Sequence, residues 1–275
     1  QLHDATLATQ KVDVVKDRPF LELWQEFCLN EWYPDMGKMQ AALPAPMLRI
    51  VPAAKAFENM DEVLPCEDYR ELMKAQELIA TVPCACRVRT EGVGEACEFT
   101  DEVHQWNCFQ FGRAADYVIK RGSGKKLSIE EALEYVDAME EDALLHIWPN
   151  TTAMGGIKTS CNCCRDCCAN YVPMDMLDEP IGKAWEKSRF EAVIDQDKCD
   201  GCQDCIDRCQ FDAIELVKPE KAAKGKKSKK LKALVDAEKC WGCGVCVLGC
   251  KEVKAIGFKL VRPEEFIPKA AAAAH

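Results

Sequence analysis

Apolar residues recur at helical spacing through much of the chain upstream of residue 190. Ser128 and Glu131 have the spacing of a capping box, and the run that follows them predicts a helix over residues 129–139. Residues 113–121 predict a shorter helix that ends at Gly122, a residue suited to a left-handed cap. Residues 69–79 and the aromatic-rich residues 20–32 predict two more helices.

The pattern changes beyond residue 190, where short apolar runs flank cysteine-rich loops. The runs at residues 192–194, 213–217, 234–235 and 255–258 predict the strands of a small β-ribbon. The lysine-rich residues 218–232 between them predict a solvated hairpin loop, with a docking patch for an acidic partner as the alternative. Near the N-terminus, the prolines at positions 44, 46 and 52 predict an extended arm over residues 34–52.

Two cysteine patterns of identical spacing dominate the C-terminal part. Each reads C-x2-C-x2-C-x3-C, which is the ligand pattern of bacterial two-cluster ferredoxins. Since the fourth cysteine of such a run ligates the other cluster, we assign one [4Fe–4S] cluster to Cys199, Cys202, Cys205 and Cys250. The other cluster is assigned to Cys240, Cys243, Cys246 and Cys209. A zinc site would leave the third and fourth cysteines of each run unexplained, and a disulfide framework suits a small secreted chain.

Nine further cysteines form two upstream groups, and their density predicts metal binding. The groups are Cys84, Cys86, Cys97 and Cys108, and then Cys161, Cys163, Cys164, Cys167 and Cys168. The simplest assignment gives the first group one [4Fe–4S] cluster and four members of the second group another. Mixed ligation between the groups, or a single cluster with spare thiols, remains an alternative, because adjacent cysteines point in different directions. Cys28 and Cys66 stand alone and are expected to be buried structural thiols.

These motifs also resemble a known family. The residues that carry the resemblance are residues 63–65, Cys84-Ala-Cys86-Arg87, Cys97, residues 108–112, residues 144–146 and residues 161–164. Over residues 47–262 the chain resembles anaerobic 4Fe–4S ferredoxin-type proteins, in which a cysteine-rich helical domain precedes a two-cluster ferredoxin domain. The resemblance implies electron transfer and names no substrate. One departure is that Gln210 and Lys251 follow the fourth cysteines, where proline is usual, which affects the turn and the shielding of the cluster rather than ligation.

Together these patterns predict an α+β protein made of a cysteine-rich, mainly helical domain and a C-terminal bacterial-type dicluster ferredoxin domain. The expected divisions are an N-terminal helix and extended arm over residues 1–60, a helical iron–sulfur domain over 61–189, a ferredoxin domain over 190–262 and a tail over 263–275. The tail ends in five alanines and a histidine, which is typical of a linker or tag remnant.

Composition narrows the class of protein. The 275 residues are 48% hydrophobic and 30% charged, as in globular domains, and the formal net charge of -10 argues against nucleic acid as a partner. We find no apolar run of membrane-spanning length. Nineteen cysteines are expected to serve metals in a reducing compartment, so we expect a cytoplasmic protein.

The sequence therefore predicts an electron-transfer protein or subunit. It would relay single electrons through two ferredoxin-type clusters, and through one or two further clusters, to or from a partner oxidoreductase. We expect no catalytic residue; His104 and His146 are expected to be ordinary packed or surface residues, with a role beside the metals as the alternative, and Trp241 is expected to shield a cluster. One other function is an iron–sulfur reductase with an open-iron cluster in the upstream domain. Another is a redox or oxygen sensor.

Overall fold

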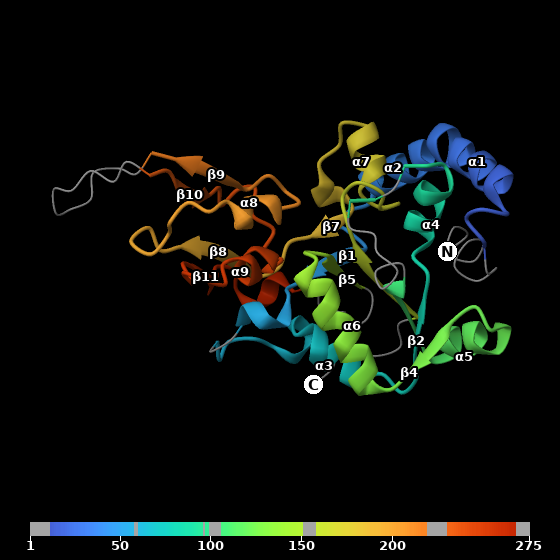
Figure 1. The fold of residues 1–275 in the computed structure, drawn as a ribbon, viewed down its shortest axis with the longest axis horizontal. Helices are drawn as coiled ribbons and strands as arrows, with labels where there is room; N and C mark the ends of the chain where they lie inside the picture. The colour runs from blue at the N-terminus through green and yellow to red at the C-terminus, as the bar shows by residue number, and fades with distance from the viewer. Residues whose placement is uncertain are drawn as a thin grey trace.

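The fold was analysed in a computed structural model, which describes residues 12–57, 60–95, 97–98, 106–150, 158–218 and 230–267. An upstream domain is built around a sheet, and a smaller C-terminal module lies at one end of the long axis of the molecule (Figure 1). Most of the predicted lysine-rich loop, and His104, lie outside the described residues. Within the described residues, no helix is both long and apolar enough to cross a membrane.

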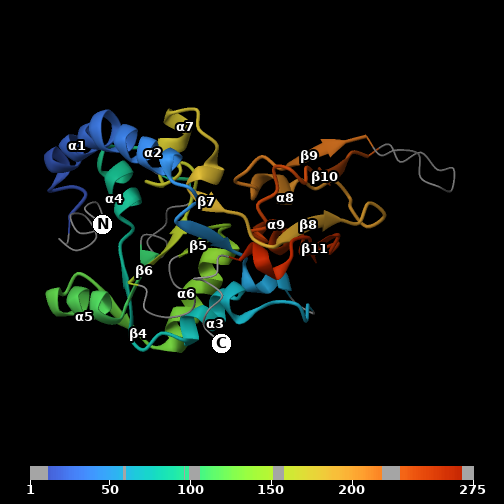
Figure 2. The same ribbon diagram turned by 180° about the vertical axis from the view of Figure 1, so that it is seen from behind.

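The helices of the described residues are mostly short. They are α1 Arg18–Phe27, the π turn η2 Cys28–Trp32, α2 Tyr33–Ala42, the 3-10 turns η3 Ala54–Phe57 and η4 Pro65–Glu67, α3 Tyr69–Lys74, α4 Ala85–Gly92, α5 Gly112–Arg121, α6 Ile129–Glu141, α7 Val172–Met176, the 3-10 turn η6 Ile181–Lys183, α8 Asp204–Asp207, α9 Val245–Gly249 and the 3-10 turn η7 Glu264–Phe266. Both views of the ribbon place α1, α2, α4 and α7 along one side of the domain (Figure 1, Figure 2).

Seven strands of the described residues form one sheet in the order β4-β2-β3-β6-β5-β1-β7. Their bounds are β1 Leu48–Val51, β2 Ile79–Val82, β3 Cys108–Phe111, β4 Lys125–Leu127, β5 Leu145–Pro149, β6 Thr159–Cys163 and β7 Trp185–Glu186. Neighbouring strands run antiparallel except β1 and β7, which are parallel. The main core lies where Tyr69 of α3, Val136 of α6 and Trp148 of β5 pack together.

The C-terminal module consists of two β-ribbons with two short helices between them. β8 Phe190–Ile194 pairs with β11 Ile256–Leu260, and β9 Ile214–Val217 pairs with β10 Lys232–Val235, both antiparallel. The four short apolar runs that the sequence analysis singled out fall in these strands, so the prediction of a ribbon is confirmed. Helices α8 and α9 contain the third cysteine of each run, Cys205 and Cys246, and pack against each other.

Two helix predictions agree closely with the structure. Glu131 donates its backbone N–H to Ser128 Oγ at 3.1 Å, and Ser128 donates its backbone N–H to Glu131 Oε2 at 2.7 Å, which completes the capping box of α6. Helix α5 ends at Gly122, which adopts the left-handed φ of 66°. The α+β class is likewise supported by the presence of both helices and sheets.

Three expectations about the upstream region need correction. The domain has more residues in helices than in strands, as expected, but the sequence did not predict the seven-stranded sheet around which it is organised. Strands β2 and β3 are buried at every position, so their sequences lack the alternation that normally identifies a strand. The helix predicted over residues 69–79 stops at Lys74, and Ile79 begins β2.

The predicted extended arm over residues 34–52 is also wrong. It contains most of α2 and all of β1, which pairs with β5 and β7 inside the sheet. Pro34 is tolerated in the first turn of α2 because a backbone N–H there has no partner within the helix. The other prolines flank β1 rather than interrupt it, so their count did not indicate an unpacked chain.

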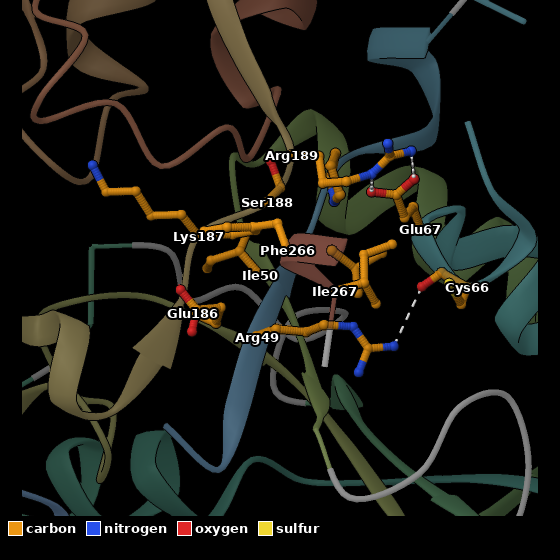
Figure 3. Close-up of a pocket in the computed structure, with 12 residues that line it drawn as sticks. Arg49, Ile50, Cys66, Glu67, Glu186, Lys187, Ser188, Arg189, Phe266 and Ile267 are labelled. Carbon is orange, nitrogen blue, oxygen red and sulfur yellow. Dashed lines mark hydrogen bonds and ion pairs between the residues drawn. The ribbon is translucent and has the colours of Figure 1, made fainter. Parts of the chain in front are cut away.

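A buried ion pair joins the two parts of the molecule at the start of β8. The Arg189 guanidinium donates from Nε to Glu67 Oε1 at 2.8 Å and from Nη2 to Glu67 Oε2 at 2.6 Å (Figure 3). Arg189 is 4% exposed and Glu67 is 6% exposed. Arg189 Nη2 also donates to the Glu62 carbonyl at 3.0 Å. Removal of one partner would therefore leave a charge buried without its counterion.

We expect the substitution Glu67→Gln to lower the free energy of unfolding by about 3–5 kcal/mol, because the charge of Arg189 stays buried and unpaired. The matched control is Glu22→Gln, which removes an exposed ion pair with Arg18 and should cost about 1 kcal/mol or less. Anaerobic denaturant unfolding followed by circular dichroism measures both. Equal effects of the two substitutions would contradict the structural role of the Glu67–Arg189 pair.

Candidate metal centres

The first cysteine run and the last cysteine of the second run share one cavity. Cys199, Cys202, Cys205 and Cys250 all line it, although Cys250 is distant from the others in sequence. This is the set that the crossed ligand pattern assigns to one cluster. Burial raises the pKa of Cys205 to about 12, and the neighbouring cysteines act in the same direction. Burial makes the thiolate form unfavourable, and a bound metal cation would offset this cost by stabilising the thiolates.

The other four cysteines of the module also lie close together. Burial raises the pKa of Cys246 well above its usual value. The charges of three neighbouring cysteines raise it further, and these are Cys243, Cys240 and Cys209. Burial likewise raises the pKa of Cys243 to about 12. The structure therefore brings the fourth cysteine of each run to the first three of the other.

The loops around the two sets repeat the same backbone geometry. Gly201 and Gly242 occupy equivalent positions and have φ of 77° and 67°. A Cβ atom at Gly201 would lie 2.3 Å from the Leu231 carbonyl oxygen, and one at Gly242 would lie 2.2 Å from the Phe190 carbonyl oxygen. Glycine is thus required twice by the same two constraints, a left-handed backbone and a close strand.

Backbone N–H groups point at several of the module's sulfurs. Ala233 donates to Cys199 Sγ at 3.4 Å, Ala213 donates to Cys209 Sγ at 3.3 Å and Ala255 donates to Cys250 Sγ at 3.2 Å. Hydrogen bonds of this kind favour thiolates and tune iron–sulfur clusters. The shared cavity, the repeated loops and these donors fit a pair of [4Fe–4S] clusters.

Six of the nine upstream cysteines surround a second and much larger cavity of about 400 Å³. They are Cys84, Cys86, Cys108, Cys161, Cys163 and Cys168. Cys84 and Cys86 lie at the N-terminal end of α4, Cys108 begins β3, and Cys161 and Cys163 lie on β6. Trp32 of η2 and Met36 and Met39 of α2 also line it. We call this space the six-cysteine cavity.

The sulfurs of the six-cysteine cavity also receive hydrogen bonds from donors of the chain. Ala169 donates its N–H to Cys86 Sγ at 3.4 Å, and Asn170 donates its N–H to Cys168 Sγ at 3.4 Å. A hydrogen bond from Cys86 lowers the pKa of Cys84 to about 7, against the opposing effect of burial. These donors make the cavity suitable for several thiolates.

Two buried amides at the six-cysteine cavity have polar atoms without a partner among the described residues. The atoms without a partner are Asn107 Oδ1, Asn107 Nδ2 and Gln40 Oε1. Asn107 is 0% exposed and Gln40 is 2% exposed. Burying an amide without hydrogen bonds is costly, so these groups indicate a polar occupant of the cavity. They were not identified from the sequence, because an isolated Asn or Gln carries no pattern.

His146 reaches the same cavity only through another residue. Its Nδ1 lies 2.6 Å from Asn162 Oδ1, while its ring stacks on Tyr69 at 3.9 Å and its Nε2 lies 3.5 Å from Glu140 Oε1. Asn162 lines the cavity and donates to the Asn107 carbonyl at 2.7 Å. The expectation that His146 is a packed residue is therefore confirmed, with an indirect connection to the cavity.

The remaining three upstream cysteines form a separate cluster. Cys97, Cys164 and Cys167 gather with Asp166 so that one ligand atom from each lies within 4.8 Å of the others. The Sγ atoms of Cys97 and Cys164 are 3.3 Å apart, and those of Cys164 and Cys167 are 3.1 Å apart. We call these four residues the three-cysteine site.

This arrangement corrects the simplest division of the upstream cysteines. Cys97 does not share a site with Cys84, Cys86 and Cys108, and Cys163 and Cys164 face different sites. The cause is local: successive residues at the end of β6 place their side chains on opposite faces. Mixed ligation, the alternative division, describes the arrangement better.

Arg87 separates the two upstream sites. It is 0% exposed and donates from Nη2 to Cys164 Sγ at 3.1 Å and to the Asn162 carbonyl at 3.4 Å. Burial disfavours its charge, but the surrounding cysteines, Cys164 and Cys84 foremost, leave its pKa raised well above the usual value. Arg87 thus acts as a buried cation that offsets thiolate charge on both sides.

The two residues that replace the usual prolines contact the upstream domain. Gln210 donates from Nε2 to the Ala143 carbonyl at 2.6 Å and accepts the Arg165 N–H at 2.8 Å. Lys251 places Nζ 2.5 Å from Glu141 Oε2. Arg208 donates to the Glu140 and Glu141 carbonyls at the end of α6, both at 2.6 Å. At these positions, docking between the domains takes the place of a local proline turn.

A shared core of aromatic residues lies between the six-cysteine cavity and the ferredoxin module. Cys163 and Cys168 belong to it, and Cys243 packs against it. Trp241 is 8% exposed and stacks on Phe211 with ring centroids 5.2 Å apart, so it is packed inward rather than presented to a partner, and its role as a shield for a cluster stays a prediction.

Cys28 and Cys66 are buried, as expected for structural thiols. Cys28 is 0% exposed, and burial raises its pKa to about 11; burial also raises the pKa of Cys66. Because each folded thiol becomes a thiolate only as pH rises through this raised pKa, both should resist alkylation by iodoacetamide at pH 8. Mass spectrometry of the native anaerobic protein, with the unfolded protein as a control, measures this. Rapid native labelling of Cys28 would contradict it.

We expect Gly242→Ala to lower bound iron by about four atoms per chain, because the added methyl group collides with β8 and displaces the loop that carries Cys240 and Cys243. The control is Gly257→Ala in the same module, where the new Cβ would meet only Val193 Cγ2 at an ordinary 3.6 Å. Iron and acid-labile sulfide per chain are the readout. Full iron in Gly242→Ala would show that the loop tolerates the change.

Comparison with known proteins agrees with this geometry in the C-terminal part. Residues 198–256 match the model of the 4Fe-4S dicluster domain family. The protein named "Putative electron transport protein YsaA" of Escherichia coli (strain K12) is 32% identical over 80 residues, which cover 29% of this chain and 41% of that protein. The match thus spans less than half of the relative, and no solved structure matches the chain. Residues 198–256 form a ferredoxin-type 4Fe–4S dicluster domain, and its iron–sulfur chemistry supports electron transfer.

Proposed function

We propose that the chain is an electron-transfer protein or subunit that relays single electrons between a partner oxidoreductase and a ferredoxin-type pair of clusters. When bound, [4Fe–4S] clusters accept and donate one electron at a time, with ferredoxin potentials near about -400 mV. The proposed ligand sets are Cys199, Cys202, Cys205 and Cys250 for one cluster, and Cys240, Cys243, Cys246 and Cys209 for the other. The crossed placement of Cys250 in the cavity of the first run is the observation that carries this proposal.

We further propose one additional [4Fe–4S] cluster in the six-cysteine cavity. Three features support it: the number of thiols, the N–H donors aimed at Cys86 and Cys168, and a volume of about 400 Å³. The unpartnered atoms of Asn107 and Gln40 would hydrogen-bond to groups inside the cavity. The chain itself supplies burial, ligands and these donors.

The packing suggests an order for the relay. Cys163 and Cys168 of the six-cysteine cavity share one core with Cys243 of the ferredoxin module, and Trp241 and Phe211 fill the space around them. The set that contains Cys243 would therefore lie between the cavity and the set that contains Cys199. Trp241 would exclude water from this core and so limit side reactions during electron transfer between the ligand sets.

A second candidate function, an iron–sulfur reductase, rests on a specific observation. Six cysteines line the upstream cavity where four complete a cluster, and the lining also includes Met36, Met39 and Trp32. Space beyond a cluster, bounded by these side chains and the unpartnered amides, would admit a small substrate. Tight binding of a small molecule that shifts the upstream cluster signal, and leaves the ferredoxin signals unchanged, would favour this function.

The number of clusters tests the proposal directly. Anaerobically purified protein should contain about twelve iron and twelve sulfide per chain, and low-potential signals should be seen by electron paramagnetic resonance (EPR) after reduction. The triple variant Cys84→Ser/Cys86→Ser/Cys108→Ser leaves only three cysteines at the six-cysteine cavity, one fewer than a cluster needs, and should remove about four iron; Cys66→Ser, at a buried thiol outside this cavity, should remove none.

About eight iron in the parent protein, unchanged in the triple variant, would confine electron transfer to the dicluster domain and remove the upstream cluster. Protein-film voltammetry with all potentials well above zero would contradict the low-potential relay. These two results are separable, since the first concerns ligand count and the second concerns the ferredoxin pair.

A further inference from the structure

We propose that the three-cysteine site binds a single tetrahedral divalent ion, zinc, through Cys97, Cys164, Cys167 and Asp166. This site is distinct from the six-cysteine cavity and from the two ligand sets of the dicluster domain. One ligand atom from each of the four residues lies within 4.8 Å of the others, and the three cysteines are buried. The proposal does not depend on the electron-transfer function.

The spacing of the sulfurs suits one ion. A tetrahedral zinc ion with Zn–S bonds of about 2.3 Å holds its ligand sulfurs about 3.8 Å apart. The Sγ atoms here are 3.1 Å apart for Cys164 and Cys167, and 3.3 Å apart for Cys97 and Cys164. Short spacing alone does not separate an ion from a cluster, since the Sγ atoms of Cys163 and Cys168 in the six-cysteine cavity are also 3.4 Å apart, so the choice between them rests on the donor atoms.

The chemistry of the donors also favours zinc over a cluster. The site offers three thiols and one carboxylate, and zinc readily accepts oxygen from Asp beside cysteine sulfur. Iron–sulfur clusters take four thiolates, and a hard carboxylate suits them poorly. Cys164 and Cys167 have the C-x2-C spacing common in structural zinc sites. A disulfide between Cys164 and Cys167 would not explain why Cys97 and Asp166 lie beside them.

The surroundings offset the negative charge of such a site. Three thiolates and one carboxylate around a divalent ion leave two negative charges, and Arg87 places Nη2 3.1 Å from Cys164 Sγ. Arg89 lies on the same side and donates to the Cys167 carbonyl at 3.4 Å. Both guanidiniums are buried, at 0% and 2% exposure. Buried cations that contact metal ligands orient them and tune the site.

The position of the ion gives it a structural role. Cys97 follows α4, whose N-terminal end carries Cys84 and Cys86, whereas Cys164 and Cys167 lie between Cys163 and Cys168. One ion would thus join the two segments that form the walls of the six-cysteine cavity. Zinc has no redox chemistry, so it would hold these segments in both oxidation states of the neighbouring clusters.

Metal analysis of the purified chain, in buffers free of chelators, tests the proposal. We expect about one zinc per chain in the parent protein and at least a fivefold loss in Cys97→Ala and Asp166→Ala. The matched controls Cys66→Ala and Asp178→Asn should keep the zinc, because neither residue lies in the site. Cobalt substitution of the parent should give the visible bands of a tetrahedral thiolate site, and Cys97→Ala should abolish them.

Two results would overturn the proposal. One is a parent protein without zinc, in which mass spectrometry finds Cys164 and Cys167 joined in a disulfide. The other is a loss of about four iron, and no zinc, in both Cys97→Ala and Asp166→Ala, which would assign these residues to a cluster. Asp166→Ala removes a single exposed carboxylate, so it keeps the test valid if Cys97→Ala fails to fold.

Discussion

The burial of many thiols that must become thiolates is the constraint on which the rest of this structure depends. An isolated buried thiolate is unfavourable, and burial raises the pKa of Cys205, Cys243 and Cys246 accordingly. Metal cations, backbone N–H donors and buried guanidiniums are the means by which the thiolate form is stabilised. In the upstream domain Arg87 meets this need, since it lies between two groups of cysteines and contacts Cys164 directly.

The two parts of the chain also pack closely against each other. Gln210 and Lys251 would be prolines in a self-contained ferredoxin of the usual pattern, but here they contact Ala143 and Glu141 at the end of α6. The Glu67–Arg189 ion pair and the core shared by Trp241 and Cys163 add further contacts between the parts. The dicluster domain thus packs against the cysteine-rich upstream domain, and its loops carry contacts to that neighbour.

The sequence predicted the dicluster domain well because its information is local. Fixed spacings within each run define the ligands, and short apolar runs define the flanking strands. The upstream domain was predicted less well because its key relations are tertiary. Strands such as β2 are buried on both faces and lose their alternation, and β1 follows prolines that suggested an unpacked arm. Nothing in the spacing showed that Cys97 would join Cys164, or that Asn107 would line a cavity.

Together, the two proposals amount to a relay whose upstream cluster would be held in place by a redox-inactive ion. In this relay, a cluster bound in the six-cysteine cavity would exchange electrons with the clusters of the dicluster domain through the core that the two parts share. The most direct measurement is EPR of the fully reduced protein, compared with a variant that lacks the cavity cysteines Cys161, Cys163 and Cys168 and so keeps only three of the six. The account predicts that the parent spectrum shows spin–spin broadening of the ferredoxin signals, and that this broadening disappears in the variant. Identical ferredoxin spectra in the two proteins would contradict it.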